Sequence, residues 1–279
     1  MKQKIKLIGL DMDGTILNDD MKLTTYTRNV LETAIAQDIE VAAISGRPLT
    51  ALHKEFLEIP GVRFSLSANG ARIQDMITNK PVHVDMISQD TLLRLMELFS
   101  NYDSMPEVYI DGQTYLNEEF YPDLEKYFRN LLFANFFRKT RKFVPNARDL
   151  ILQCPDGMEK IDALFSSTED QADCLEHILA DFPDVQVSCT GYGLEITKKG
   201  SNKGAGLLKL AEVLGIKQEE TLAIGDADND LDMIKAAGIG IAMVNGEEHL
   251  KKIADYISEE DNNHDGAAKM LEKFALDLE

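Results

Sequence analysis

Residues 5–18 read IKLIGLDMDGTILN, in which a mainly apolar run over residues 5–10 is followed by two carboxylates. A short apolar run bounded by Asp is typical of a strand that is buried on both faces of a parallel sheet. Asp11 and Asp13 then stand two positions apart at the end of this strand. Two like charges at that place need an explanation beyond strand formation.

Further apolar runs predict the rest of a sheet. They lie at residues 41–44 (VAAI), 64–68 (FSLSA), 221–224 (TLAI) and 239–243 (IGIAM). Segments with helical periodicity separate them, at residues 24–37, 49–59, 205–214 and 230–237. Strands that alternate with helices predict an α/β fold with a doubly wound, Rossmann-like and mainly parallel sheet.

The middle of the chain has a different pattern. Residues 107–116 (EVYIDGQTYL) centre on Asp111-Gly112, which is a hairpin signal. Further strands are expected at residues 149–153 (DLILQ), 160–166 (KIDALFS) and 184–189 (DVQVSC), with helices near 88–101 and 168–181. We therefore expect an α+β domain over residues 83–190, inserted into a discontinuous core formed by residues 1–82 and 191–279.

The composition of the chain excludes some classes of binding partner. The 279 residues include 29 basic and 48 acidic side chains, a net charge of -19 that disfavours nucleic acid and anionic membranes as partners. No apolar stretch reaches the roughly 18 residues of a membrane span. Cys154, Cys174 and Cys189 form no CxxC pair, which suits a reducing compartment. We expect a cytoplasmic protein and predict no protein partner.

Polar clusters follow three of the predicted strands. Asp11 and Asp13 follow the first, residues 45–47 (SGR) follow the second, and Asp226 and Asp230 follow a later one. Ligands of doubly wound sheets bind outside the carboxyl ends of the strands, so these clusters should meet there. Carboxylates so close together cannot all ionise without a cation, and oxygen ligands that leave room for water suit Mg²⁺.

Two simpler interpretations of the acidic clusters were weighed. A calcium-binding loop needs Gly at its sixth position, but Gly14 is fourth from Asp11. Residues 226–232 (DADNDLD) have Leu231 at the sixth position and Ala237 at the twelfth, where such a loop carries Glu. The calcium loop is thereby excluded, whereas a plain Asp-Gly turn remains open for DMDGT taken alone.

Residues 197–206 (TKKGSNKGAG) supply positive charge in an acidic chain. The stretch between Glu195 and Glu212 contains no acid but four lysines, Lys198, Lys199, Lys203 and Lys209, and glycines stand at the start of the predicted helix. Backbone N–H groups at a helix start, together with a lysine, favour an anion. The alternative is a solvated basic turn.

Together these motifs resemble a known family. DMDGTIL, SGR, the Lys203-Gly204 helix start and residues 225–230 (GDADND) are similar to the four motifs of the haloacid dehalogenase superfamily, in its Cof-type branch with a large subclass IIB cap. Residues 69–71 (NGA) and 264–266 (HDG) extend the resemblance over the whole chain.

The resemblance implies roles for individual residues. Asp11 would be the nucleophile that becomes an aspartyl phosphate, and Asp13 the general acid and base. Mg²⁺ would bind the Asp11 carboxylate, the Asp13 carbonyl, Asp226 and Asp230, the last directly or through water. The phosphoryl oxygens would be held by Met12, Ser45, Gly46, Lys203 and Asn229. Arg47 would contact substrate or pair with an acid at the domain interface, and Asn69 is a further possible substrate contact.

The resemblance implies a Mg²⁺-dependent phosphatase of small phosphorylated metabolites, sugar phosphates foremost. A phosphosugar mutase shares DxDGT and is an alternative. A regulatory module that forms an aspartyl phosphate without turnover is another. A nucleotide-sugar transferase with a D-x-D motif is weaker, because it leaves GDADND unexplained.

Overall fold

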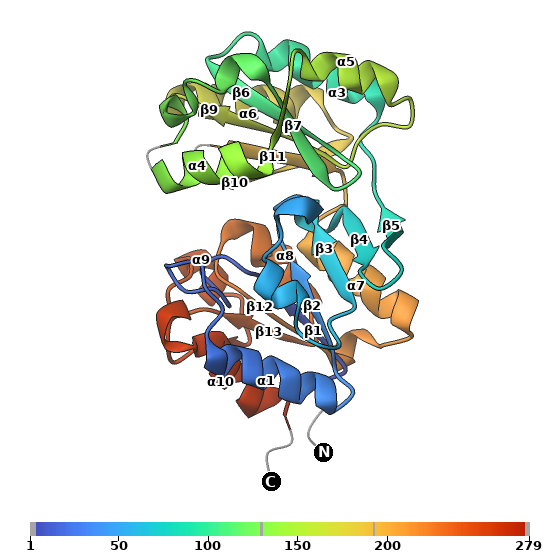
Figure 1. Ribbon diagram of the computed structural model, residues 1–279, viewed down its shortest axis with the longest axis vertical. Helices are drawn as coiled ribbons and strands as arrows, with labels where there is room; N and C mark the ends of the chain where they lie inside the picture. Colours follow the sequence, from blue (N-terminus) through green and yellow to red (C-terminus); the bar gives the residue numbers. More distant parts are fainter. Residues whose placement is uncertain (1–3, 129–130, 192, 277–279) are drawn as a thin grey trace. The chain divides into compact units, whose positions relative to one another are not determined.

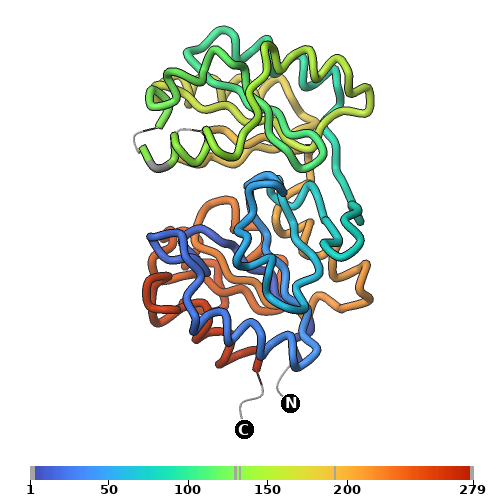
Figure 2. The backbone as a smooth tube through the Cα atoms, viewed as in Figure 1, coloured from blue at the N-terminus to red at the C-terminus, as the bar shows by residue number. Residues whose placement is uncertain are grey.

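The computed structural model describes residues 4–128, 131–191 and 193–276. It divides into two compact units. The first comprises Met1–Ser45, Leu52–His83 and Asn202–Glu279, and the second comprises Gly46–Ala51 and Val84–Ser201. Figure 2 shows this chain path by colour, with most of the blue, cyan and orange-to-red tube in one unit and the green-to-gold tube in the other.

An eight-stranded sheet forms the centre of the first unit, in the order β14-β13-β12-β1-β2-β3-β4-β5. Its strands are β1 (Leu7–Leu10), β2 (Glu40–Ile44), β3 (Phe64–Ser67), β4 (Arg72–Asp75), β5 (Lys80–Val84), β12 (Thr221–Gly225), β13 (Ile239–Ala242) and β14 (Tyr256–Ile257). Neighbours from β14 to β3 pair in parallel, and β3 pairs antiparallel with β4. The predicted doubly wound, mainly parallel sheet is confirmed.

The helices of the first unit are α1 (Thr25–Ala36), α2 (Lys54–Leu57), α7 (Lys203–Leu214), α8 (Leu231–Ala236), α9 (Glu248–Lys251) and α10 (Gly266–Phe274). Helices α1 and α10 lie side by side although they come from opposite ends of the chain (Figure 1). The helix predicted over residues 49–59 is wrong in its first half, where a short 3-10 turn at Leu49–Ala51 precedes α2. There Thr50 donates its N–H to the Gly112 carbonyl at 3.1 Å instead of continuing a helix.

Close packing fixes helix α7 against β1. Both faces of β1 are buried, and a Cβ added to Gly9 would come within 2.7 Å of Ile44 and 2.9 Å of Leu207. Helix α7 begins sharply because the Asn202 side chain accepts the Ala205 N–H at 2.7 Å. The first residue of α7, Lys203, is thereby placed beside the strand that carries the acidic motif.

A six-stranded sheet forms the centre of the second unit, in the order β10-β11-β9-β6-β7-β8. Its strands are β6 (Ser104–Ile110), β7 (Gln113–Asn117), β8 (Lys142–Val144), β9 (Lys160–Phe165), β10 (Val185–Thr190) and β11 (Gly193–Lys198). Its helices are α3 (Gln89–Phe99), α4 (Leu131–Thr140), α5 (Ala147–Gln153) and α6 (Thr168–Asp181). The predicted hairpin at Asp111-Gly112 and the two predicted helices are confirmed.

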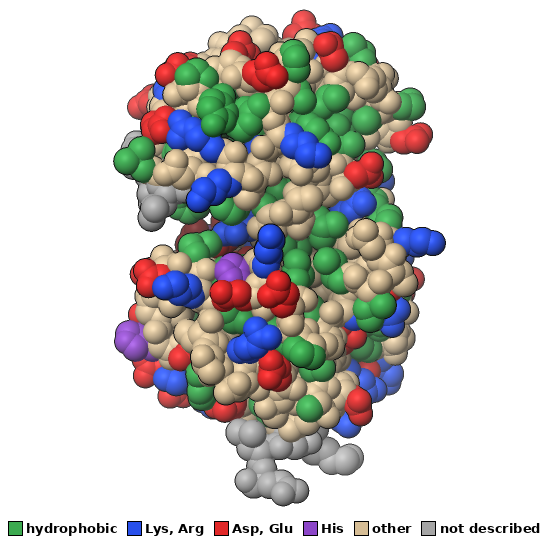
Figure 3. Space-filling view, viewed as in Figure 1, with side chains coloured by type: hydrophobic (Ala, Val, Ile, Leu, Met, Phe, Trp, Pro, Cys, Tyr) green, Lys and Arg blue, Asp and Glu red, His purple; other side chains and the backbone are tan. Residues whose placement is uncertain are grey.

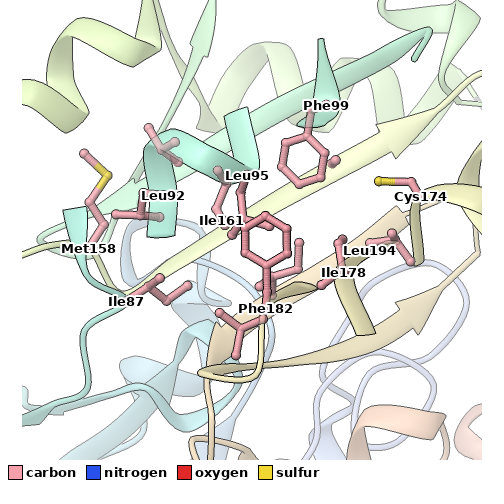
Figure 4. Packing of buried hydrophobic residues seen from close by; sticks show 14 of the residues in the cluster. Ile87, Leu92, Leu95, Phe99, Met158, Ile161, Cys174, Ile178, Phe182 and Leu194 are labelled. Carbon is pink, nitrogen blue, oxygen red and sulfur yellow. The ribbon is translucent and has the colours of Figure 1, made fainter. Parts of the chain in front are cut away.

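The apolar core of the second unit lies between its sheet and three helices. Figure 4 shows Phe99 of α3, Ile161 of β9 and Ile178 of α6 pointing toward one another. Cys174 packs among them as a buried thiol, and the chain's other two cysteines are free as well.

Two predictions for the middle of the chain are corrected. Residues 149–153 are part of helix α5 and not a strand, because Asn146 caps the Arg148 N–H at 3.0 Å and the buried Ala147 and Ile151 stand one helical turn apart. The second unit also continues past residue 190 to Ser201, because β11 pairs with both β9 and β10.

Surface charge is mixed rather than uniformly acidic. On the face drawn in Figure 3, acidic and basic side chains are interspersed over both units. Among the described residues, no helix combines the length and the apolar character that a membrane crossing requires.

Candidate functional site

Three predicted acidic side chains lie together at the carboxyl ends of β1 and β12. Asp11 follows β1 directly, its N–H donates to the Ile224 carbonyl of β12 at 3.0 Å, and its side chain is buried. Asp226 follows β12, and Asp230 follows within the next turn. One carboxylate oxygen of each of these three residues lies within 4.8 Å of the others. The convergence predicted for the two acidic clusters is therefore present in the first unit.

Lys203 lies between two of these acids. Its ammonium Nζ is 2.6 Å from Asp11 Oδ1 and 2.6 Å from Asp230 Oδ1, and the side chain is almost fully buried. Burial opposes the charge of the ammonium, but the attraction of Asp11 and Asp230 is stronger and raises the pKa of Lys203. Lys203 is thus a fixed cation and not part of a solvated basic turn.

Backbone and hydroxyl donors orient the other acids. Asp230 Oδ2 accepts the N–H groups of Asp226 at 2.9 Å and Ala227 at 3.0 Å. Asp226 Oδ1 accepts the Thr15 hydroxyl at 3.0 Å. Neither carboxylate can rotate away without losing these bonds, so the cluster is preorganised.

The charges in this cluster do not balance. Burial raises the pKa of Asp11 well above its ordinary value, and the neighbouring Asp230 and Asp226 add to the rise against the opposing effect of Lys203. Burial and the charge of Asp230 raise the pKa of Asp226 to about 6. Three carboxylates against one ammonium leave excess negative charge, and a hard divalent cation with oxygen ligands is the group that this donor set fits.

The DMDGT motif forms a tight turn around this cluster. The Met12 carbonyl accepts the N–H groups of Thr15, Ile16 and Leu17 at 3.3, 3.2 and 3.0 Å. Gly14 has a φ of 77°, and a Cβ at this position would overlap the Asp226 carboxylate. The turn interpretation is correct for the backbone, and the turn is also what brings Asp11 and the half-buried Asp13 to the site.

A second group of predicted residues surrounds the end of β2. The Ser45 N–H donates to the Leu66 carbonyl at 3.0 Å, and the Asn69 N–H donates to the Ser45 carbonyl at 3.0 Å. Asn229 Nδ2 donates to Asn69 Oδ1 at 3.2 Å. Asn69 has a φ of 55°, a left-handed conformation that Asn tolerates better than most residues. Ser45 of SGR, Asn69 of NGA and Asn229 of GDADND are therefore linked by hydrogen bonds within the first unit.

Gly46 and Arg47 group with the second unit, although they directly follow Ser45. Arg47 Nη1 donates to the Ala51 carbonyl at 3.3 Å, and the Arg47 guanidinium lies 4.6 Å from the centre of the Phe136 ring. Neither contact is the predicted substrate contact or the predicted ion pair, so the role of Arg47 stays a prediction.

The sequence interpretation missed two supporting residues. Thr15, quoted only as part of the motif, holds Asp226, and Asn245 Nδ2 donates to the Gly14 carbonyl at 2.8 Å. Thr15 could have been found, since a hydroxyl next to an acidic motif is a common carboxylate partner. No local pattern marks Asn245, because its partner is distant in the sequence.

Comparisons with known proteins show the family to which the chain belongs. A family model described as haloacid dehalogenase-like hydrolase matches residues 8–271, a range that includes all four motifs. A 5-amino-6-(5-phospho-D-ribitylamino)uracil phosphatase of Bacillus subtilis (strain 168), YcsE, is 28% identical over 281 residues, which cover 98% of this chain and 96% of that protein.

Solved structures share the fold over its full length. A haloacid dehalogenase-like hydrolase from Bacteroides thetaiotaomicron has a TM-score of 0.78 and 27% identity, covering 97% of this chain and 99% of that chain. A structure titled as a subclass IIB sugar phosphatase of the same superfamily has a TM-score of 0.80 at 21% identity, covering 96% and 98%. The predicted superfamily and the predicted hydrolase class are confirmed by these matches.

Proposed function

Because this chain belongs to the haloacid dehalogenase-like hydrolase family, we propose that it is a Mg²⁺-dependent phosphatase of small phosphorylated metabolites that works through an aspartyl phosphate. The observation that carries this proposal is the buried cluster in which Lys203 bridges Asp11 and Asp230 beside Asp226. Such a cluster suits an anionic substrate, because a cation and a lysine can neutralise phosphoryl charge there.

Mg²⁺ would be held by the carboxylates of Asp11, Asp226 and Asp230 and by the Asp13 carbonyl, and when bound it would supply positive charge for the phosphoryl oxygens. Asp11 attacks phosphorus in line, so that a bond forms from its carboxylate oxygen while the bond from phosphorus to the leaving oxygen breaks. Asp13 gives its proton to that oxygen, and an alcohol departs.

Hydrolysis of the aspartyl phosphate reverses the proton transfer. Asp13, now ionised, takes a proton from water as the water oxygen attacks phosphorus. The bond from phosphorus to Asp11 breaks, and inorganic phosphate leaves. Lys203 already contacts the nucleophile at 2.6 Å, so its charge is present where phosphate charge would develop. Met12, Ser45, Gly46 and Asn229 are proposed to hold the phosphoryl oxygens.

The proposed substrates are phosphomonoesters with a hydroxylated or sugar-like body. The relatives named as phosphatases of a ribityl compound and of sugars support this class. The second unit is proposed as a cap domain that sets specificity, with Arg47 and Asn69 as candidate substrate contacts. Its apolar core and separate sheet give it the independence that such a domain needs. We place the reaction in the cytoplasm.

The test is a panel of sugar, polyol and nucleotide monophosphates, assayed for release of inorganic phosphate with Mg²⁺ and with a chelator. Activity should require Mg²⁺ and should be lost in Asp11→Asn. Asp20→Asn, an exposed aspartate beyond the same motif, is the matched control and should keep full activity. Activity that survives Asp11→Asn would show that Asp11 is not the nucleophile.

The same assay separates the alternatives. Phosphate that moves to a second hydroxyl instead of to water would favour a mutase. A burst of one equivalent without further turnover would favour a regulatory module. Mass spectrometry of the acid-quenched protein should find the phosphoryl group on the peptide that contains Asp11.

A further inference from the structure

Three carboxylates stand side by side across the sheet of the second unit. In the register of the strands, Asp162 of β9 pairs directly with Glu195 of β11 on one side and with Glu107 of β6 on the other. Like charges directly opposite one another destabilise a sheet. Glu107 and Asp162 are also buried, which makes their charges more costly. This row of carboxylates needs a reason other than stability.

Two cations lie against the row. Lys160 Nζ is 2.9 Å from Asp162 Oδ2 and 3.1 Å from Glu195 Oε2. Arg141 donates to Glu107 through Nε at 3.0 Å and through Nη2 at 3.3 Å. Lys160 has no exposed surface at all, so its ammonium is held in one place.

The ammonium of Lys160 makes a third contact, with a group outside the row of carboxylates. Lys160 Nζ donates to the Gly46 carbonyl at 3.0 Å. Gly46 is the glycine of the SGR motif, and its N–H is among the proposed phosphate donors. Glycine has no side chain to restrict its backbone, so its conformation must be fixed from outside.

The segment that follows Gly46 is fixed to the second unit as well. Thr50 donates its N–H to the Gly112 carbonyl at 3.1 Å, and a Cβ added to Gly112 would come within 2.6 Å of Leu49. The guanidinium of Arg47 lies over the Phe136 ring. Among these contacts, the one made by Lys160 is with Gly46, the residue that directly follows Ser45.

We propose that Lys160 is a positioning residue, whose ammonium holds the Gly46 carbonyl and thereby fixes the backbone that binds the phosphate group. The carboxylate row orients this ammonium, and its two charged partners keep it directed at Gly46. That a phosphate group binds here rests on the proposed function. The contact between Lys160 and Gly46 can be tested whether or not the protein turns over a substrate. A charge-assisted hydrogen bond is strong enough to fix a glycine peptide that a neutral donor would leave mobile.

The first experiment compares Lys160→Met with the unchanged protein in two measurements. Hydrogen exchange, followed by mass spectrometry without substrate, should rise in the peptide that contains residues 46–51 and stay unchanged in peptides from β1 and β12. The affinity for inorganic phosphate in Mg²⁺ should fall about 10-fold to 100-fold, the range expected for one charge-assisted hydrogen bond. The affinity for Mg²⁺ without phosphate should stay within about twofold.

A second variant guards against misfolding. Lys160→Met leaves the buried Asp162 without its cation, whereas Lys160→Met with Asp162→Asn removes that charge and should fold. The double variant should show the same faster exchange at residues 46–51. Lys126→Met is the matched control, because Lys126 pairs with Asp103 at 2.6 Å in the same unit and should change neither measurement.

The outcomes separate this inference from the proposed function. Unchanged exchange at residues 46–51 in the folded double variant would overturn the role of Lys160, whatever the activity. Faster exchange with weaker phosphate binding would support it. If the protein hydrolyses no phosphomonoester, the proposed function is wrong. The exchange measurement still shows whether Lys160 fixes the backbone at Gly46.

Discussion

Each unit of this protein contains a largely buried group of three carboxylates, but the two groups differ in the cations that balance their charge. In the first unit, Asp11, Asp226 and Asp230 face a single ammonium, that of Lys203. In the second unit, Glu107, Asp162 and Glu195 face two cations, Lys160 and Arg141.

The difference teaches how a buried charge cluster can be interpreted. An unbalanced cluster at the end of parallel strands indicates a missing cation, because its own residues cannot neutralise it. A nearly balanced cluster in the middle of a sheet is largely neutralised by its own cations, so we look for its function in the other groups that those cations bind. The following experiments test this contrast in order of expected size.

Lys203→Met should have the largest effect on stability. In a chelator, we expect unfolding to become easier by about 3–5 kcal/mol, because Asp11 and Asp230 lose their buried partner. Added Mg²⁺ should restore part of this loss, since it brings positive charge to the same acids. Urea unfolding followed by circular dichroism, with and without Mg²⁺, is the measurement. A loss that Mg²⁺ does not reduce would contradict the idea of a missing cation.

Glu107→Gln should cost about 3 kcal/mol, because it leaves the buried guanidinium of Arg141 without its carboxylate. Mg²⁺ should recover none of this loss, in contrast to Lys203→Met. The same urea titration applies. Recovery by Mg²⁺ would mean that the second cluster binds metal, and the comparison between the two clusters would fail.

Mg²⁺ should stabilise the unchanged protein by about 2–3 kcal/mol at a hundredfold excess over its dissociation constant. This gain should be present at pH 8 and mostly absent at pH 5. The pKa of Asp226 is raised to about 6, so at the lower pH the carboxylate is protonated and a metal must displace that proton. Thermal unfolding at both pH values measures the gain, and equal gains would be inconsistent with carboxylate ligands.

Asp226→Asn should stabilise the protein without metal by about 1–2 kcal/mol at pH 8. The pKa of Asp226 in the folded state is raised from its ordinary value to about 6, so the folded state loses stability as pH rises from the ordinary value to about 6, and Asn removes this penalty. Thr15 can still donate to the amide oxygen. The variant should also lose its Mg²⁺ response. A less stable variant in chelator would show that Asp226 is satisfied without a cation.

Asp162→Asn should have the smallest effect, within about 1 kcal/mol. Burial raises the pKa of Asp162 well above its ordinary value, and the effects of Glu195 and Glu107 add to the rise against that of Lys160. Burial opposes the charge of Asp162, so replacement by an amide removes a costly charge together with its attraction to Lys160, and the two effects largely offset one another. Urea unfolding checks this, and a loss as large as that of Glu107→Gln would show that the attraction to Lys160 outweighs the cost of burying the charge.

The sequence was most informative where local pattern and position in the fold agree. Short apolar runs predicted β1, β12 and their neighbours, and the polar residues after them predicted the site, because parallel strands end at one edge. It failed at residues 149–153, where a short apolar run fits a strand or a helix equally and the Asn146 cap decided.

Contacts between residues that are distant in the chain could not be predicted from local sequence patterns. The carboxylate row could not be predicted, since it depends on the register of β6, β9 and β11. The contact between Lys160 and Gly46 depends on that same register and joins residues from distant parts of the chain. The extension of the second unit to Ser201 follows from the pairing of β11, which no turn signal marks.

The insertion of one unit into the other has a consequence for synthesis on the ribosome. The second unit, apart from residues 46–51, is a continuous segment that ends at Ser201, so it can fold before the first unit is complete. Strand β1 must wait for its neighbour β12, and Asp11 must wait for Lys203. The acidic motif therefore emerges early but gains its charge partner late, and a chain truncated within β11 would carry Asp11 without Lys203 beside it.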